Sequence, residues 1–342
     1  RATWGELRPL KCLESRASTE SRRKALSAGQ QQNARGIFLV VLAMSVFAVQ
    51  DVLIKFLSTD VSLFQILFFR STLGILLIVM FQRATGKAIK FWTAYPFLSI
   101  TRGILFFIGY SAFYFTQSKI PIANATVLFL VSPFFITMMS IYFFGSSVGL
   151  RRWFAMLIGF SGVVIIAQPE AGEFDWLYLL PVGVAFAYAI SMMIAKTTAE
   201  KDTVYQQIIV MYIVTATLAG ITGIFYGDGS IADWGIRGIE FVSHPWRMDI
   251  LSINLYLLAV AVVGTSAFIL LTGGYRIADP AVISPYEYSG LATVLILGFI
   301  VFGEVPSAHD GVGMLLIVGS GIYLFYRERI QGQDNAAEAT LR

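Results

Sequence analysis

The sequence predicts an all-α integral membrane protein whose ten transmembrane helices form two inverted five-helix repeats. Ten apolar stretches of bilayer-spanning length follow one another from Gly36 to Tyr326, in two groups of five. Hydrophobic residues make up 56% of the 342 residues, and charged residues only 13%. Five spans per half put the second half into the membrane from the opposite side, as an inverted repeat requires.

Each expected span has about the 20 helical residues needed to cross a hydrocarbon core of roughly 30 Å. The first repeat covers residues 36–169 and the second covers residues 176–329, with a short polar tail at 330–342. The expected spans are 36–57, 61–82, 94–117, 121–143, 150–167, 176–197, 204–226, 254–274, 280–302 and 308–326.

The basic, serine-rich residues 1–35 precede the first span. We expect a disordered polar tail here rather than a transit peptide, because Glu6, Glu14 and Glu20 make the segment too acidic for a transit peptide.

The distribution of basic residues predicts that both termini lie in the cytoplasm. With the amino terminus inside, most of the 25 Lys and Arg residues fall on the inner side. Loops rich in Lys and Arg remain on the cytoplasmic side of a membrane. We therefore expect the chain in the plasma membrane, which in a bacterium is the inner membrane. The basic residues on the outer side are Lys55, Lys119, Arg237 and Arg247.

Composition excludes several classes of function. The spans leave no room for a soluble catalytic domain, and Cys12 is the only cysteine. His244 and His309 lie far apart in predicted loops, so we expect no metal site and no cofactor. No glycine-rich phosphate loop is present, which argues against ATP hydrolysis. The net charge of +4 reflects membrane orientation and does not indicate nucleic-acid binding.

Prolines interrupt three of the expected spans. Pro133 lies in the fourth span, Pro181 in the sixth and Pro285 in the ninth. Because proline removes a helix hydrogen bond, each predicts a bend or break. The fourth and ninth spans are counterparts in the two halves, so we interpret both as candidate gates.

Seven short segments, in order along the ten spans, resemble the EamA-type transporters of the drug/metabolite transporter superfamily. The resemblance covers residues 36–329, nearly all of the hydrophobic part of the chain. The segments are Phe68-Phe69-Arg70-Ser71, Thr101-Arg102-Gly103, Arg151-Arg152-Trp153, Ile158-Gly159-Phe160-Ser161-Gly162-Val163, Ser284-Pro285-Tyr286-Glu287-Tyr288, Phe302-Gly303-Glu304-Val305-Pro306 and Tyr326-Arg327-Glu328.

This resemblance implies a ten-helix inverted repeat with a central substrate cavity and alternating access. Spans two, three, five and nine look most like members proposed to carry S-adenosylmethionine, followed by riboflavin carriers and exporters of amino acids or drugs. The chain departs from the family pattern at Ser146, where many members carry an acidic residue. Glu304, the corresponding residue of the second half, is acidic as in the family. We interpret Glu304 as a capping or loop residue.

Charged residues inside a span cost several kcal/mol unless they are paired or face a water-filled cavity, so they are the first site candidates. Asp51 and Lys55 lie one helical turn apart and are placed to pair, although Lys55 also lies near enough to the helix end to reach the interface. Arg70 and Arg102 have either a substrate-binding role or a structural one. Glu287, just after Pro285, is the leading candidate, as a site for a proton or for a cationic substrate group.

Tyrosines add hydrogen-bonding groups at similar depths. Tyr110 and Tyr114 share a helix face with Arg102, and Tyr288 follows Glu287. Such a face suits a cavity wall for a flat substrate that bears a carboxylate.

The leading hypothesis is a secondary transporter of a small polar metabolite, with Arg102 and Glu287 together favouring a zwitterion. The alternatives are a membrane enzyme acting on lipids, for which the histidines lack partners, and a non-transporting sensor or scaffold. The sequence leaves open coupling to protons or to exchange, the direction of transport and the oligomeric state, a homodimer included.

Overall fold

The computed structural model describes most of the chain, and every regular element in the described part is a helix. The expected tail at 330–342 and the family position Ser146 lie outside the described residues. The described residues are 7–144, 150–166, 176–230, 240–248, 251–309, 311–316, 318–320, 322, 323 and 326.

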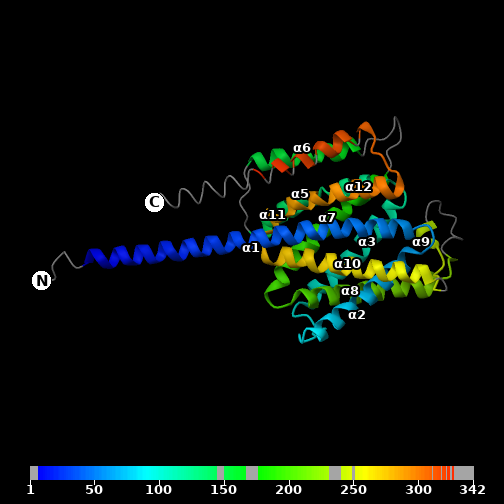
Figure 1. The fold of residues 1–342 in the computed structure, drawn as a ribbon, viewed down its shortest axis with the longest axis horizontal. Coiled ribbons are helices and arrows are strands. Elements are labelled where there is room, and N and C mark those ends of the chain that lie inside the picture. The colour runs from blue at the N-terminus through cyan, green and yellow to red at the C-terminus, as the bar shows by residue number, and fades with distance from the viewer. Residues whose placement is uncertain are drawn as a thin grey trace.

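The helices form a bundle in which most axes run along one direction (Figure 1). Their bounds are α1 Leu7–Leu57, α2 Leu63–Ala84, α3 Pro96–Gln117, α4 Ile122–Phe129, α5 Ser132–Phe144, α6 Leu150–Ile166, α7 Leu180–Thr197, α8 Val204–Tyr226, α9 Glu240–Ser243, α10 Leu251–Ile277, α11 Pro280–Ile283 and α12 Ser289–Phe302, with 3₁₀ segments η1 Trp176–Leu179, η2 Thr198–Glu200 and η4 Ser284–Tyr288.

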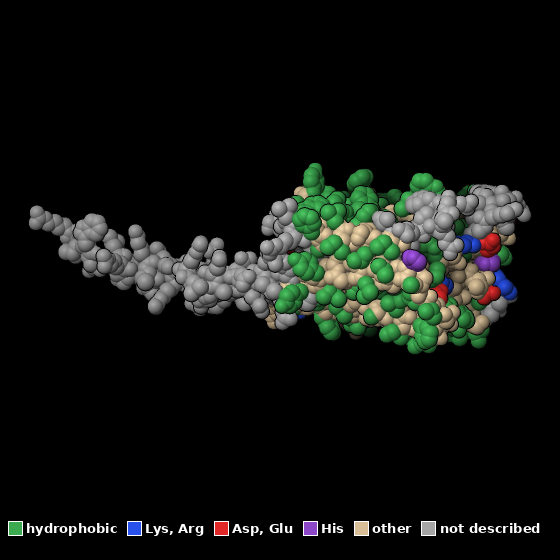
Figure 2. All heavy atoms as spheres, turned by 90° about the horizontal axis from the view of Figure 1, so that it is seen from above, with side chains coloured by type: hydrophobic (Ala, Val, Ile, Leu, Met, Phe, Trp, Pro, Cys, Tyr) green, Lys and Arg blue, Asp and Glu red, His purple; other side chains and the backbone are tan. Residues whose placement is uncertain are grey.

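Eight helical segments are long and apolar enough to cross a membrane, and they confirm eight of the ten expected spans. The fifth and tenth expected positions hold shorter apolar helices, Trp153–Gly162 and Gly311–Ser320. The space-filling view shows apolar side chains along the length of the bundle, with described charged groups gathered near one end (Figure 2). This distribution suits a protein whose sides contact lipid.

Helix α1 begins at Leu7, whereas the sequence predicts a disordered tail up to residue 35. Its apolar spanning part starts at Gln31, and the earlier turns project beyond the bundle (Figure 1). The helical form of residues 7–35 agrees with their composition, because the segment is rich in Ala, Arg, Lys, Glu and Gln, which have high helix propensity. Disorder of this tail stays a prediction of the sequence.

Close contacts between helices hold the bundle together. Helix α1 packs against α10 and α12, α2 against α8 and α10, and α3 against α7 and α8. Small residues permit these approaches, since a Cβ at Gly74 would lie 2.5 Å from the Tyr212 ring and one at Gly103 would lie 2.6 Å from Val214 Cβ. Close backbone packing of this kind is a main source of helix association in lipid.

Two spans are broken along their length, as Pro133 and Pro285 predict. The fourth span consists of α4 and α5, and the ninth consists of α11, η4 and α12. Tight turns satisfy part of the backbone at the first break, where Phe134 N–H donates to the Val131 carbonyl. Pro181 behaves differently: it lies in the first turn of α7, where its missing N–H costs nothing. Within the sixth span, Trp176–Glu200, the 3₁₀ segment η1 gives way to α7 next to this proline, so Pro181 marks a change of helix type near the start of the span.

The contact of α3 with α8 gives a testable stability difference. Gly103→Ala places a methyl group against Val214 Cβ, so we expect a loss of about 1–3 kcal/mol from overpacking. Gly109→Ala on the same helix is the matched control, because its Cβ would meet only Val184 Cγ1 at 3.6 Å. Thermal unfolding in detergent measures both variants, and equal midpoints would contradict the packing argument.

Candidate functional site

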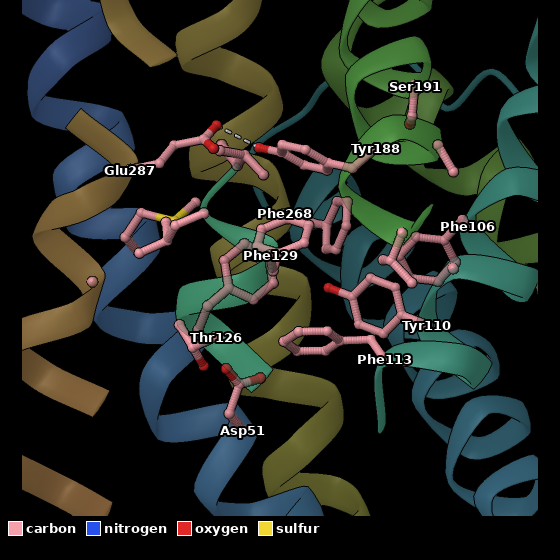
Figure 3. Close-up of a pocket in the computed structure, with 18 of the residues that line it drawn as sticks. Asp51, Phe106, Tyr110, Phe113, Thr126, Phe129, Tyr188, Ser191, Phe268 and Glu287 are labelled. Atoms are coloured by element: carbon pink, nitrogen blue, oxygen red, sulfur yellow. Dashed lines mark hydrogen bonds between the residues drawn. The ribbon is translucent and has the colours of Figure 1, made fainter. Parts of the chain in front are cut away.

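A pocket lies inside the bundle between α1, α3, α4, α7, α10 and the broken ninth span. Its wall is largely aromatic, and its two carboxylates are Asp51 and Glu287 (Figure 3). The labelled side chains come from six different elements, so only the assembled bundle forms the pocket. Aromatic lining residues are Phe47, Phe106, Tyr110, Phe113, Tyr114, Phe129, Tyr188 and Phe268.

Glu287 lies in η4 at the second helix break and is fully buried. Its Oε1 accepts hydrogen bonds from Tyr188 at 2.7 Å and from Tyr275, and its Oε2 accepts one from Ser132 at 3.2 Å. Ser132 is the first residue of α5, so the two helix breaks meet at this carboxylate. All three donors are neutral hydroxyls, and none of the ion pairs between described side chains includes Glu287.

Asp51 belongs to α1 and lies at the opposite end of the view from Glu287 in Figure 3. Its Oδ1 accepts a hydrogen bond from Tyr114 at 3.3 Å, and Tyr114 in turn accepts one from Gln50. The residue Asp51 is 8% exposed, so unlike Glu287 it retains some accessible surface.

Asp51 and Lys55 do not pair with each other. Lys55 Nζ instead lies 2.5 Å from Glu304 Oε1 and donates to the Ile120 carbonyl at 3.3 Å. The Oε2 atom of Glu304 accepts the Ile122 N–H at the start of α4, at 2.9 Å. Glu304 is thus a capping group, as predicted, although it caps a helix far from it in sequence. Lys55 reaches this carboxylate beyond the end of its own helix, while Asp51 turns toward the pocket.

Arg70 is fully buried and does not belong to the pocket lining. Its guanidinium lies over the rings of Tyr110, Phe106, Phe268 and Tyr212, with centroid distances of 4.5, 5.1, 5.4 and 5.8 Å. Among the described residues, its guanidinium donates a hydrogen bond to the Tyr110 hydroxyl at 3.5 Å. Aromatic faces therefore supply most of the stabilisation of this charge.

Arg102 also lies behind the wall. Its nitrogens donate to Ser191 Oγ at 3.2 Å, Thr272 Oγ1 at 3.1 Å and Gln207 Oε1 at 3.5 Å, which joins α3 to α7, α10 and α8. Of these partners, Ser191 lines the pocket. Arg102 therefore reaches the cavity through one serine rather than directly.

The structure brings together some of the residues singled out from the sequence. Asp51, Glu287, Tyr110 and Tyr114 line one pocket, whereas Arg70, Arg102 and Tyr288 do not. Sequence reasoning missed Tyr188, Ser191, Ser132 and Tyr275. A signal for the first two was available, because residues 184, 188 and 191 share one helix face on which polar groups interrupt an apolar span.

The EamA-like transporter family model matches residues 34–168 and 175–327, which is most of the chain. The chain belongs to this family. It is accordingly an integral membrane protein and a secondary transporter of small metabolites, and it is not an enzyme.

Curated relatives within the family differ in their named substrates. The chain is 26% identical to an S-adenosylmethionine uptake transporter of Rickettsia bellii, over 86% of this chain and 94% of the relative. It is also 26% identical to the pseudopaline exporter CntI of Pseudomonas aeruginosa, over 84% and 95%. A riboflavin transporter of Rhizobium johnstonii is 27% identical, over 69% and 72%.

A crystal structure of another protein superposes with a TM-score of 0.65 and 17% sequence identity, covering 87% of this chain and 99% of that one. At this identity the likeness shows the fold alone.

The hydrogen bonds of Glu287 predict a stability difference between two buried tyrosines. Tyr275→Phe removes a donor to the carboxylate, so we expect a loss of about 1–3 kcal/mol. Tyr212→Phe is the control, because the Tyr212 hydroxyl is equally buried and has no hydrogen-bond partner among the described residues. Equal shifts in thermal unfolding would show that the Tyr275 hydrogen bond contributes nothing to stability.

Proposed function

We propose that this transporter moves a small, flat organic molecule with a positively charged group, a cation or a zwitterion, by alternating access. The observation that carries the proposal is the aromatic pocket with Glu287 at the meeting point of two broken helices. Substrate enters this pocket from one side of the membrane and leaves on the other, and no ATP is consumed.

The charge of the pocket supports a positively charged substrate group. Asp51 and Glu287 line the wall, while Arg70 and Arg102 stand behind it. A buried carboxylate whose partners are neutral hydroxyls attracts a cation, because the low dielectric strengthens the interaction. The aromatic rings favour a flat apolar portion and contribute cation–π attraction.

The helix breaks support a moving site. Residues 36–169 and 176–329 are, in this proposal, two inverted five-helix repeats, and the shorter helices at the fifth and tenth positions complete the ten spans. The broken fourth and ninth spans are then counterparts that meet at Ser132 and Glu287. Discontinuous helices at a repeat interface are typical of substrate sites in secondary transporters.

S-adenosylmethionine is the substrate we put first, since it carries a sulfonium, an ammonium and a flat base, and since relatives are named for its uptake. Riboflavin, amino acids and drugs are the alternatives on the same scaffold. A sensor or scaffold would transport none of them. Protonation of Glu287, or exchange with a second solute, would couple the cycle. The described pocket lies within one chain, so the proposal does not require a homodimer.

Counterflow of labelled S-adenosylmethionine into proteoliposomes tests the substrate and the site together. We expect exchange by the wild type and a fall of about tenfold or more with Glu287→Gln, because a buried charge pair with the substrate is lost. Glu240→Gln, at an exposed carboxylate in α9, is the matched control and should retain exchange. If the wild type exchanges riboflavin or amino acids but no S-adenosylmethionine, the substrate proposal fails. If it exchanges none of the three, S-adenosylmethionine and both of these alternatives are excluded as substrates.

We further propose that both termini lie in the cytoplasm and that the membrane is the plasma membrane, the bacterial inner membrane. The excess of Lys and Arg on the side of the amino terminus supports this orientation.

Cys12, the only cysteine, provides a natural probe of this orientation. A membrane-impermeant maleimide should leave Cys12 unlabelled in intact cells and label it after permeabilisation. The control is Thr59→Cys in a Cys12→Ala background, because Thr59 is exposed between α1 and α2 on the proposed outer side. Labelling of Cys12 in intact cells would reverse the orientation.

A further inference from the structure

Helix α7 presents two polar side chains to the inner end of the pocket, one turn apart. Tyr188 and Ser191 both line the cavity and share one helix face with Val184 (Figure 3). Residues three apart on a helix lie about 5–6 Å from each other at Cβ. The two side chains therefore leave α7 at neighbouring positions of the pocket wall, and the Tyr188 ring extends from there toward Glu287 (Figure 3).

These two side chains are linked to opposite charges. Tyr188 donates to Glu287 at 2.7 Å, so a carboxylate lies at this position. Ser191 Oγ accepts from Arg102 Nε at 3.2 Å, so a guanidinium lies behind this position. Along this turn of α7, Tyr188 thus contacts a negatively charged group and Ser191 contacts a positively charged one.

The hydroxyl of Ser191 remains able to donate. A hydroxyl accepts through its lone pairs and donates through its hydrogen, and the contact with Arg102 uses only a lone pair. The described partners of Arg102 are neutral oxygens, so its positive charge polarises the Ser191 hydroxyl as a donor. A donor of this kind suits an anionic acceptor such as a carboxylate.

We propose that this part of the pocket is a subsite for the head group of an α-amino acid. The substrate ammonium lies between Glu287 and Tyr188, and the substrate carboxylate accepts the Ser191 hydroxyl, with Arg102 as the positioning charge behind it. The inference rests on the proposed transport function and narrows its substrate class to molecules that carry such a head group.

A zwitterion fits this arrangement better than a simple ion. A plain cation pairs with Glu287 but leaves the positive charge behind Ser191 without an anion. A plain anion suits Ser191 but lies next to the carboxylate of Glu287. An α-amino acid carries both charges in one head group and leaves the rest of the molecule for the aromatic wall.

Binding to the purified full-length chain in lipid nanodiscs tests the subsite. The probes are S-adenosylmethionine and its decarboxylated form, which lacks only the carboxylate. We expect Ser191→Ala to weaken S-adenosylmethionine binding about tenfold and to leave the decarboxylated form unchanged, because one charge-assisted hydrogen bond is removed. Ser191→Thr keeps the hydroxyl and should restore the preference. Ser71→Ala, at a buried serine of α2 outside the pocket lining, is the matched control.

The subsite would be overturned if Ser191→Ala weakened the binding of both probes to the same extent, or if it changed the binding of neither. A second probe set separates this result from failure of the S-adenosylmethionine proposal. It comprises L-tryptophan, tryptamine without the carboxylate and indole-3-propionate without the ammonium.

Preference of the wild type for tryptophan over tryptamine, lost in Ser191→Ala, supports the subsite even if S-adenosylmethionine is not transported. The subsite is overturned, even if transport is observed, when two results occur together. The wild type binds all three indoles equally or binds none of them, and it also shows no preference for S-adenosylmethionine over its decarboxylated form.

Discussion

The structure depends on the need to accommodate four charged side chains inside a bundle that is surrounded by lipid. Asp51, Arg70, Arg102 and Glu287 are all at least nine-tenths buried. Each would destabilise an isolated helix in a bilayer by several kcal/mol. Their partners come from other helices, so satisfying these groups determines how the helices pack and not only where each one crosses the membrane.

The partners in the centre of the bundle are mostly neutral dipoles and rings rather than opposite charges. Glu287 has three hydroxyl donors, Arg102 has three neutral oxygens and Arg70 has aromatic faces. A hydroxyl donor can be exchanged for a donor on a ligand without leaving another charge unpaired. Breaking a buried ion pair would leave one charge uncompensated, which is far more costly. This chemistry suits a site that must bind and release its substrate.

A direct ion pair occurs instead at one end of the bundle. Lys55 and Glu304 join the end of α1 to the residues that follow α12, and the same carboxylate caps α4. Glu304 follows Gly303, whose φ of 67° terminates α12 in the left-handed conformation that favours glycine. The chain reversal there directs the carboxylate toward two other helices, α1 and α4.

The sequence by itself determined the helices, the membrane class and the helix breaks around Pro133 and Pro285. Spans are decided by local hydrophobicity and length, which need no knowledge of partners, and the break around Pro285 follows from its missing N–H. It also singled out Glu287 as a candidate, because a carboxylate within an apolar run stands out, and this residue lines the pocket. Only the tertiary structure decided which charges face the cavity. Lys55 pairs with a residue 249 positions away rather than with Asp51, and Arg102 reaches the pocket through Ser191. The physical reason is that the rotation of each helix about its own axis is set by packing against its neighbours, and that rotation selects the side chains that line the pocket.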